Sequence, residues 1–399
     1  MNFDFSFDRH DSESILARRL QITALIVYSI FTFIHVVGPS RLIVLHPEIS
    51  GRLTLISKVC LLVLVLLSLP AVVKSKKNIF LFGISIGILL VVKFSVKSSG
   101  AAFGGLSSLY LLFFILPVVG FPQVILADFW SRLFGYLVTI LFLNHWATLN
   151  VWNPATHQWK FGFGFANPNI LGINSFVLLL ELSVLYRFFN RFAWFGLGST
   201  FLVIMFLSHS RTSIWSIIIF MLVWIIIGKC KLYSASWFRY FVFILPILML
   251  LVSLFFIYWY RINPHNPLVK IFDLFVSNRL SLGSKFLKEY GIKWGAAFVN
   301  NAEYNLDMGQ VSLLLTNGLI ATTIFLFYYG LANWNLLRLN YWEFIPAMIA
   351  FLCVSLTETS FSRINSNPFL LTFGLMMTQF NYPNQLWDLK DNWKINDDK

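Results

Sequence analysis

The sequence predicts an all-α polytopic membrane protein with about twelve transmembrane helices and a large extracytoplasmic loop between spans nine and ten. Hydrophobic residues make up 58% of the 399 residues and charged residues only 12%, whereas a soluble domain has about 45–50% and about 25%. The mean hydropathy is +0.73. The apolar residues form long runs separated by polar segments, as membrane-spanning helices do. A single soluble domain, a disordered chain and a disulfide scaffold are therefore excluded.

The spans follow from the length of the apolar runs, because a helix of roughly 20 apolar residues crosses the hydrocarbon core. This rule predicts spans near residues 20–38, 53–73, 78–96, 102–125, 133–149, 170–186, 192–208, 213–228, 240–260, 309–331, 342–357 and 367–381. The first run follows a polar stretch and has no cleavage site after it, so we expect it to be retained as a span. Residues 1–399 then form a single integral membrane domain.

The distribution of Lys and Arg between the spans predicts the orientation. If the N-terminus is cytoplasmic, the short inner segments, including the one that would contain Arg132, hold more basic residues than the short outer ones. The positive-inside rule therefore predicts a protein of the cytoplasmic membrane with both termini in the cytoplasm. We attribute the net charge of +13 to this topology and to contact with anionic lipid headgroups, and we expect no binding of nucleic acid.

Two of the predicted outer segments, 150–169 and about 261–308, are longer than a turn requires. The second contains many charges and also apolar residues at near-helical spacing, namely Ile271, Leu274, Phe275, Leu282 and Phe286. This pattern is typical of an amphipathic helix on a membrane surface. A pure transporter has little need of such a loop, whereas a protein acting on a substrate held at the outer surface does.

An outer Ser210-Arg211 pair separates two apolar runs. Arginine offers a rigid fork of donors that suits phosphate oxygens, and the neighbouring hydroxyls can add hydrogen bonds. The alternative is an outer turn with an Arg that reaches the headgroups. We take Arg211 as a candidate catalytic residue and Ser210 as a candidate substrate contact.

Polar residues at other span ends allow two interpretations each. Asp307, where the long loop re-enters the membrane, is placed to take a proton from a hydroxyl or to cap the next helix. Glu358 suits a site role or a surface ion pair with Arg363. Asn167 and Asn169 suit a substrate contact or a turn with an N-cap.

Several motifs are missing from the sequence. It has no GxxxxGK[ST] phosphate loop, no HExxH motif and no Asp-x-Asp pair for a metal–nucleotide-sugar complex. The three cysteines, Cys60, Cys230 and Cys353, have no short spacing, which excludes a Cys-based zinc site. We therefore expect no cofactor and no metal, and a donor that is anchored in lipid.

The order of the polar motifs resembles that of the Wzy-type polysaccharide repeat-unit polymerases, which are related to the O-antigen ligases. The matching segments are Gly164-Phe165-Ala166-Asn167-Pro168-Asn169-Ile170-Leu171-Gly172, Ser210-Arg211-Thr212, Asn278-Arg279-Leu280-Ser281-Leu282, and Asp307 before Gly318-Leu319-Ile320. The resemblance covers nearly the whole chain. The chain departs from the family pattern at Met308 and Gln310, where Asn and Tyr are usual.

This resemblance implies a metal-independent membrane glycosyltransferase. Such enzymes join oligosaccharide repeat units carried on undecaprenyl pyrophosphate into O-antigen, capsule or exopolysaccharide on the outer face of the cytoplasmic membrane. It implies Asp307, Arg211 and Arg279 as catalytic residues. It implies Asn167, Asn169, Ser210, Glu358 and Arg261, at the start of the loop, as substrate-binding residues. A chain-length regulator and a flippase are the protein partners that it implies.

Two alternatives stay open. A ligase would move finished chains onto another acceptor, although a His at position 307 would have favoured it. A flippase for lipid-linked oligosaccharides, or another transporter, also fits twelve spans. Charge buried in mid-membrane would be typical of a transporter, and the only candidates within the predicted spans are Lys58, Lys93 and Glu181.

Overall fold

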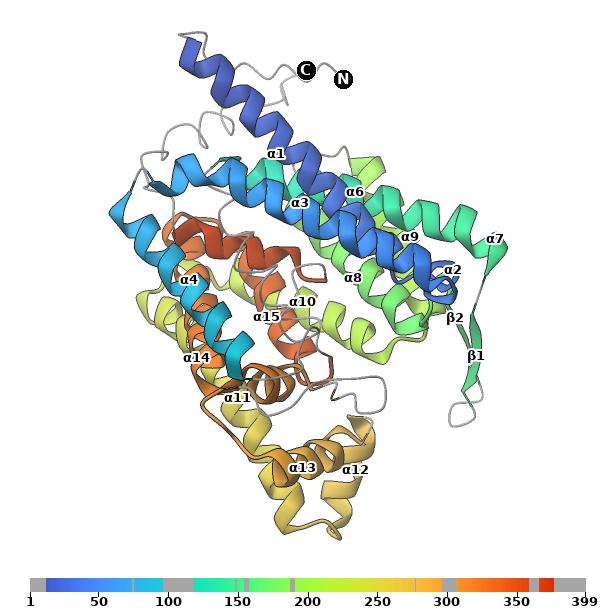
Figure 1. Cartoon of the computed structure of the whole chain (residues 1–399). Helices are drawn as coiled ribbons and strands as arrows, with labels where there is room; N and C mark the ends of the chain where they lie inside the picture. The colour runs from blue at the N-terminus through green and yellow to red at the C-terminus, as the bar shows by residue number, and fades with distance from the viewer. Residues whose placement is uncertain are drawn as a thin grey trace.

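The computed structural model describes residues 12–73, 75–95, 118–147, 149–153, 158–186, 191–276, 278–295, 306, 308–358 and 366–376 (Figure 1). The first part of the chain forms α1 (Ser12–Val37), α2 (Arg41–Leu45), α3 (Pro47–Val73), α4 (Lys76–Ser95), α6 (Phe121–Leu137), the π-helical η2 (Val138–Leu143) and α7 (Asn144–Trp146). The second part forms β1 (Asn150–Asn153), β2 (Gln158–Phe161), α8 (Pro168–Val184), α9 (Arg191–Leu207), α10 (Arg211–Lys229), η4 (Leu232–Ser234), α11 (Ser236–Ile262), α12 (Pro267–Phe275), α13 (Arg279–Tyr290), α14 (Gly309–Arg338), η5 (Trp342–Phe344), α15 (Ile345–Val354) and η7 (Pro368–Met376).

The prediction of an all-α membrane protein is confirmed at this level. Among the residues described, six helices are long and apolar enough to cross a bilayer, and three shorter apolar helices accompany them. Large apolar side chains on these helices face outward, such as Phe134, Leu222 and Phe255, as contact with lipid requires. The predicted number of twelve spans stays a prediction.

The centre of the bundle consists of α8, α14 and α15, most of whose side chains are buried. Helix α14 packs along α11, α10 packs along α15, and α1 packs on α3 and α6. At one end of the molecule, α12 and α13 lie together beyond α11 (Figure 1). There they cover a smaller apolar core, which includes Ile257, Leu280 and Met308.

The predicted boundary between spans 102–125 and 133–149 is wrong. Residues Gln123–Trp146 form one continuous helical stretch, so Arg132 does not lie in an inner connecting segment. Its guanidinium is instead almost wholly buried within α6, together with Asp128. The sequence predicted a connecting segment here because it does not reveal that Asp128 and Arg132 pair inside the helix bundle. Residues 102–117 of the predicted fourth span lie outside the described residues.

The two long segments that were predicted to lie outside contain more structure than was expected. Part of 150–169 is the antiparallel hairpin β1–β2, in which Trp152 pairs with Trp159. The amphipathic pattern of the second segment belongs to two helices: α12 ends at Phe275, and Asn278, in a left-handed conformation (φ 59°), precedes α13. Helix α12 exposes an apolar stripe of Leu268, Ile271 and Leu274, which suits a position at a membrane surface.

Helix α14 is broken at Gly318, whose backbone has φ 83° and ψ 172°. A side chain there would collide with the backbone of Gly295, since an added Cβ would lie 2.5 Å from its Cα. The amide groups of Leu319 and Ile320 donate to the carbonyl groups of Lys293 and Trp294, at 2.9 and 3.3 Å. The segment after α13 therefore docks on the break and supplies the partners that the interrupted helix lacks.

Candidate functional site

The segment that follows α15, Ser355–Glu358, is the point at which several helix ends meet. The amide of Gly309, which begins α14, donates to the Ser355 carbonyl at 2.8 Å. The hydroxyls of Thr212 and Thr357 lie 3.2 Å apart and join the start of α10 to this segment. Residues from distant parts of the sequence are thus held on one side of the bundle, and we call this region the junction.

Helix α8 enters the junction through a capped first turn. The Asn167 side chain accepts a hydrogen bond from the Asn169 amide at 2.8 Å, and Pro168 occupies the first helical position. This is the N-cap that was the alternative interpretation of Asn167-Pro168-Asn169. Gly172, one turn later, is packed so closely that an added Cβ would lie 2.5 Å from the Cβ of Ser210.

Ser210 shapes the turn between α9 and α10. Its side chain is buried, and its hydroxyl lies 3.0 Å from that of Ser213. The Ser210 amide donates to the Ser208 hydroxyl at 3.2 Å. The Ser210 hydroxyl is therefore engaged within the protein, and we assign it no contact with substrate.

Arg279 and Glu358, distant in the sequence, form an ion pair at the junction. The Arg279 Nη2 donates to Glu358 Oε1 at 3.3 Å, and the two side chains are only 11% and 13% exposed. Asp273 holds the start of α13 in place, because its Oδ1 accepts hydrogen bonds from the Leu280 and Ser281 amides at 2.8 and 3.1 Å. This contact fixes the helix whose first residue is Arg279.

Arg211, the first residue of α10, is exposed. No ion pair of its guanidinium is seen with any residue that the structure describes. Lys160 on β2 lies within its electrostatic reach: partial burial and, second, the charge of Arg211 lower the pKa of Lys160 from its usual value. Two cations held together in this way repel each other, so an anion bound between them would be stabilised.

Asp307, the predicted base, lies outside the described residues, as does Arg363. The residues on either side of Asp307 are buried in the smaller core: Leu306 is fully buried and Met308 is 3% exposed. Gln310 is buried too, and its Oε1 accepts a hydrogen bond from the Ser253 hydroxyl at 3.2 Å. The two departures from the family pattern, Met308 and Gln310, are therefore packing residues here.

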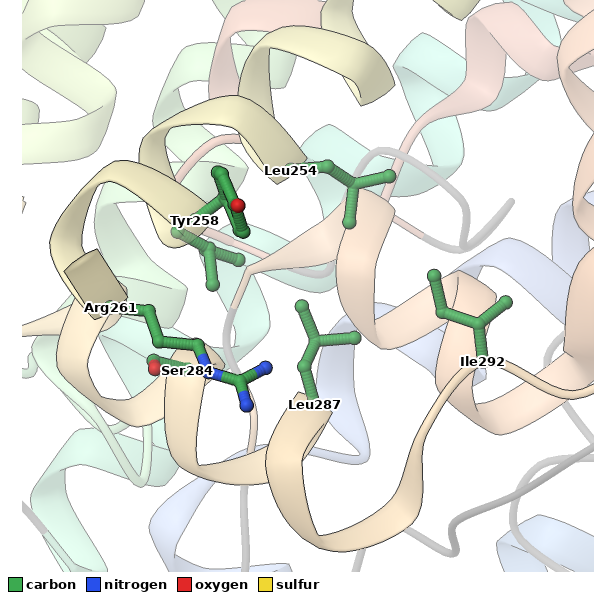
Figure 2. A pocket seen from close by; sticks show the side chains of 7 residues that line it. Leu254, Tyr258, Arg261, Ser284, Leu287 and Ile292 are labelled. Atoms are coloured by element: carbon green, nitrogen blue, oxygen red, sulfur yellow. The ribbon is translucent and has the colours of Figure 1, made fainter.

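Arg261 lies apart from the other candidates, at the end of α11. It lines a mostly apolar cavity of about 210 Å³ between α11 and α13, together with Leu254, Ile257, Tyr258, Ser284, Leu287 and Ile292. Figure 2 shows the Arg261 guanidinium extending toward Ser284 and Leu287 across the opening. This cavity therefore has a mostly apolar lining and one positive charge, that of Arg261.

A second polar cluster is enclosed by α1, α6 and α8. Arg132 donates through Nε and Nη2 to Asp128 Oδ2, at 3.0 and 2.8 Å, and its Nε lies 3.7 Å from Glu181 Oε2. The hydroxyls of Tyr28 and Thr32 donate to Asp128 Oδ1 at 2.7 and 2.8 Å. The three charged side chains are at most 1% exposed.

The candidate residues thus fall into groups that the sequence only partly revealed. The structure brings Arg279 and Glu358 into contact and ties Arg211 to Glu358 through the adjacent Thr212–Thr357 pair. Sequence reasoning missed Lys160 as a member of the site. The signal available was a lysine between aromatic residues in a long segment between predicted spans, but its approach to Arg211 depends on the hairpin.

The described residues contain no group of three or more His, Cys, Asp or Glu side chains arranged to hold a metal ion. No protein-family model matches the chain, and no curated protein matches it significantly. The fold and the junction therefore define a helical membrane protein with cationic side chains gathered at the ends of its helices.

Proposed function

We propose that this protein is a membrane glycosyltransferase of the Wzy polymerase type. It would transfer a growing oligosaccharide from undecaprenyl pyrophosphate to the next lipid-linked repeat unit, on the outer face of the cytoplasmic membrane. The observation that supports the proposal is the junction, at which the Arg279–Glu358 ion pair and the Thr212–Thr357 hydrogen bond bring together segments that carry three separate motifs, with Arg211 next to Thr212 in the chain.

The charges of the junction suit a reaction with a pyrophosphate leaving group. Negative charge grows on the leaving oxygen in the transition state, and fixed cations stabilise it without reorganisation. Arg211 and Lys160 carry no ion pair with the described residues and would meet this charge directly. Arg279 is already paired with Glu358, so Glu358 would act as a positioning residue that orients the Arg279 fork.

The remaining roles rest on the sequence and its resemblance. Asp307 would accept the proton of the acceptor hydroxyl, and Asn169 at the first turn of α8 would contact the substrate. Arg261 and its apolar cavity would hold part of a lipid-linked substrate near the membrane surface. In this proposal the chain has twelve spans, cytoplasmic termini and an outer loop over residues 261–308.

The experiment that tests the proposal uses purified full-length protein in lipid nanodiscs with its native lipid-linked repeat units. Polymer should form and should continue to form with a chelator present. Arg211→Lys keeps the charge but loses the fork, and we expect it to reduce the rate by about 10²-fold or more. Near-normal polymer from this variant would mean that Arg211 only reaches toward headgroups.

A proton-coupled transporter or flippase is the second candidate, because one observation favours it. The Asp128–Arg132–Glu181 cluster places ionisable groups deep within the helices, and such residues commonly mark ion or proton pathways. The two candidates differ in where single lipid-linked repeat units accumulate when the gene is deleted. They would accumulate outside the membrane without a polymerase and inside it without a flippase.

A further inference from the structure

The buried cluster of α1, α6 and α8 contains one more carboxyl group than its cation can neutralise. Arg132 supplies one positive charge, whereas Asp128 and Glu181 would together carry two negative charges, and all three side chains are buried. A net charge enclosed in this way is strongly unfavourable unless it is paired or neutralised by a proton.

The hydrogen bonds distinguish the two carboxyl groups. Asp128 accepts four of them, from Tyr28, Thr32 and two nitrogens of Arg132, so its ionised form is well stabilised. Among the residues that the structure describes, neither oxygen of Glu181 has a hydrogen-bond partner, and the ion-pair contact of its carboxyl group is with Arg132 Nε at 3.7 Å. Glu181 therefore lacks the donors that a buried carboxylate requires.

The two carboxyl groups also lie close together, because Arg132 Nε is 3.0 Å from Asp128 Oδ2 and 3.7 Å from Glu181 Oε2. Two carboxylates in such contact cannot both be ionised without strong repulsion. A proton on one of them removes the repulsion and supplies the missing hydrogen bond at the same time.

We infer that Glu181 binds a proton at neutral pH and donates it in a hydrogen bond to the Asp128 carboxylate. The cluster is then neutral and forms a proton-binding site inside the membrane domain. This inference does not depend on the proposed glycosyltransferase activity.

Few other charged groups surround this site. From α1, Tyr28 contacts Asp128, and His35 lies within the electrostatic reach of Arg132. The packed helices α9 and α10 carry charged residues only at their ends, namely Arg191, Arg211 and Lys229. The described helix η7 carries none. The proton of Glu181 is therefore the simplest means of neutralising the second carboxyl group.

Loss of this proton would weaken the contact between α6 and α8, because the cluster would then enclose a net negative charge. The native state holds a proton that an exposed glutamate would have released at neutral pH. Stability should consequently fall as the pH rises through the release of this proton, and Glu181→Gln should remove that part of the pH dependence.

Infrared spectroscopy tests the assignment directly. We would compare full-length wild-type protein and Glu181→Gln in lipid nanodiscs at neutral pH. The wild type should show a protonated carboxylic-acid carbonyl band that the variant lacks. The control is Glu48→Gln, whose side chain is 61% exposed and which should change only carboxylate bands. Loss of a carboxylate band in Glu181→Gln would overturn the inference.

Thermal unfolding of the same proteins gives an independent result. Glu181→Gln keeps a hydrogen-bond donor where the acid O–H stands, so its midpoint should remain close to that of the wild type. Asp128→Asn replaces one accepting carboxylate oxygen by an NH2 group and removes the negative charge that pairs with Arg132, so it should lower the midpoint clearly. If Glu181→Gln fails to fold while Asp128→Asn folds, then Glu181 is the ionised member and the inference is wrong.

Discussion

The ion pair between Arg279 and Glu358 joins two segments far apart in the sequence, and its strength is measurable. At 3.3 Å and an effective dielectric constant of about 20, Coulomb's law gives a gross attraction of about 5 kcal/mol. Desolvation of both groups offsets much of this attraction. The pair is only slightly exposed, so we expect a net coupling of about 1–3 kcal/mol, as for other hydrogen bonds to charged groups.

A double-mutant cycle measures this coupling. Arg279→Gln, Glu358→Gln and the double variant would be unfolded reversibly in mixed detergent micelles, and the free energy of unfolding compared with that of the wild type. Each single variant leaves one charge without its partner, so the double variant should be less destabilised than the sum of the two.

The matched control uses Lys285 and Glu289, which lie one helical turn apart on α13 and are both exposed. Their coupling should be at most about 0.5 kcal/mol. If the effects of Arg279→Gln and Glu358→Gln simply add, the two residues do not act together, and Glu358 would lose its assigned role in positioning Arg279.

Three further predictions concern the site and the topology. Because the pKa of Lys160 is lowered, Lys160 should lose its charge at a lower pH than an ordinary lysine, and affinity for a pyrophosphate-lipid donor should fall with it. At alkaline pH, Lys160→Arg should bind the donor about five- to tenfold more tightly than the wild type. Identical pH profiles of the two proteins would place Lys160 outside the site. Gly172→Ala should lower the unfolding free energy by about 1–3 kcal/mol, because the added Cβ would collide with Ser210. Gly83→Ala in α4 should not lower it, since a Cβ added there would meet no described atom of a neighbouring element within 4 Å. Equal effects of the two substitutions would contradict the close approach of α8 to α10. In intact cells a membrane-impermeant thiol reagent should label Lys288→Cys in the outer loop and leave the exposed native Cys230 unlabelled, and the reverse pattern would invert the topology.

The sequence was sufficient for the fold class because apolar runs report membrane spans directly. It also selected Arg211 and Glu358 as candidates, because they stand at predicted span ends, and Arg279 through the family resemblance. It could not pair them, however. Glu358 was expected to meet Arg363, its neighbour in sequence, whereas the structure pairs it with Arg279.

The largest error concerned Arg132, for a physical reason that the sequence conceals. Charged residues interrupt an apolar run in the same way whether they form a polar connection or a buried ion pair. Asp128 and Arg132 stand four residues apart, which places them on one face of a helix. Burial of this pair is explained only by its contacts with Tyr28 and Thr32 of α1 and with Glu181 of α8. Such contacts between helices are not encoded in local periodicity.

The proposed function is the extension of lipid-linked oligosaccharides on the outer face of the membrane. The most direct measurement is the length and sidedness of the lipid-linked oligosaccharides in a strain from which the gene is deleted, with and without a plasmid that encodes the wild type or Arg211→Lys. We expect single repeat units on the outer face in the deletion strain, polymer restored by the wild type, and little polymer with Arg211→Lys. Single units confined to the inner face would contradict it and would identify a flippase instead.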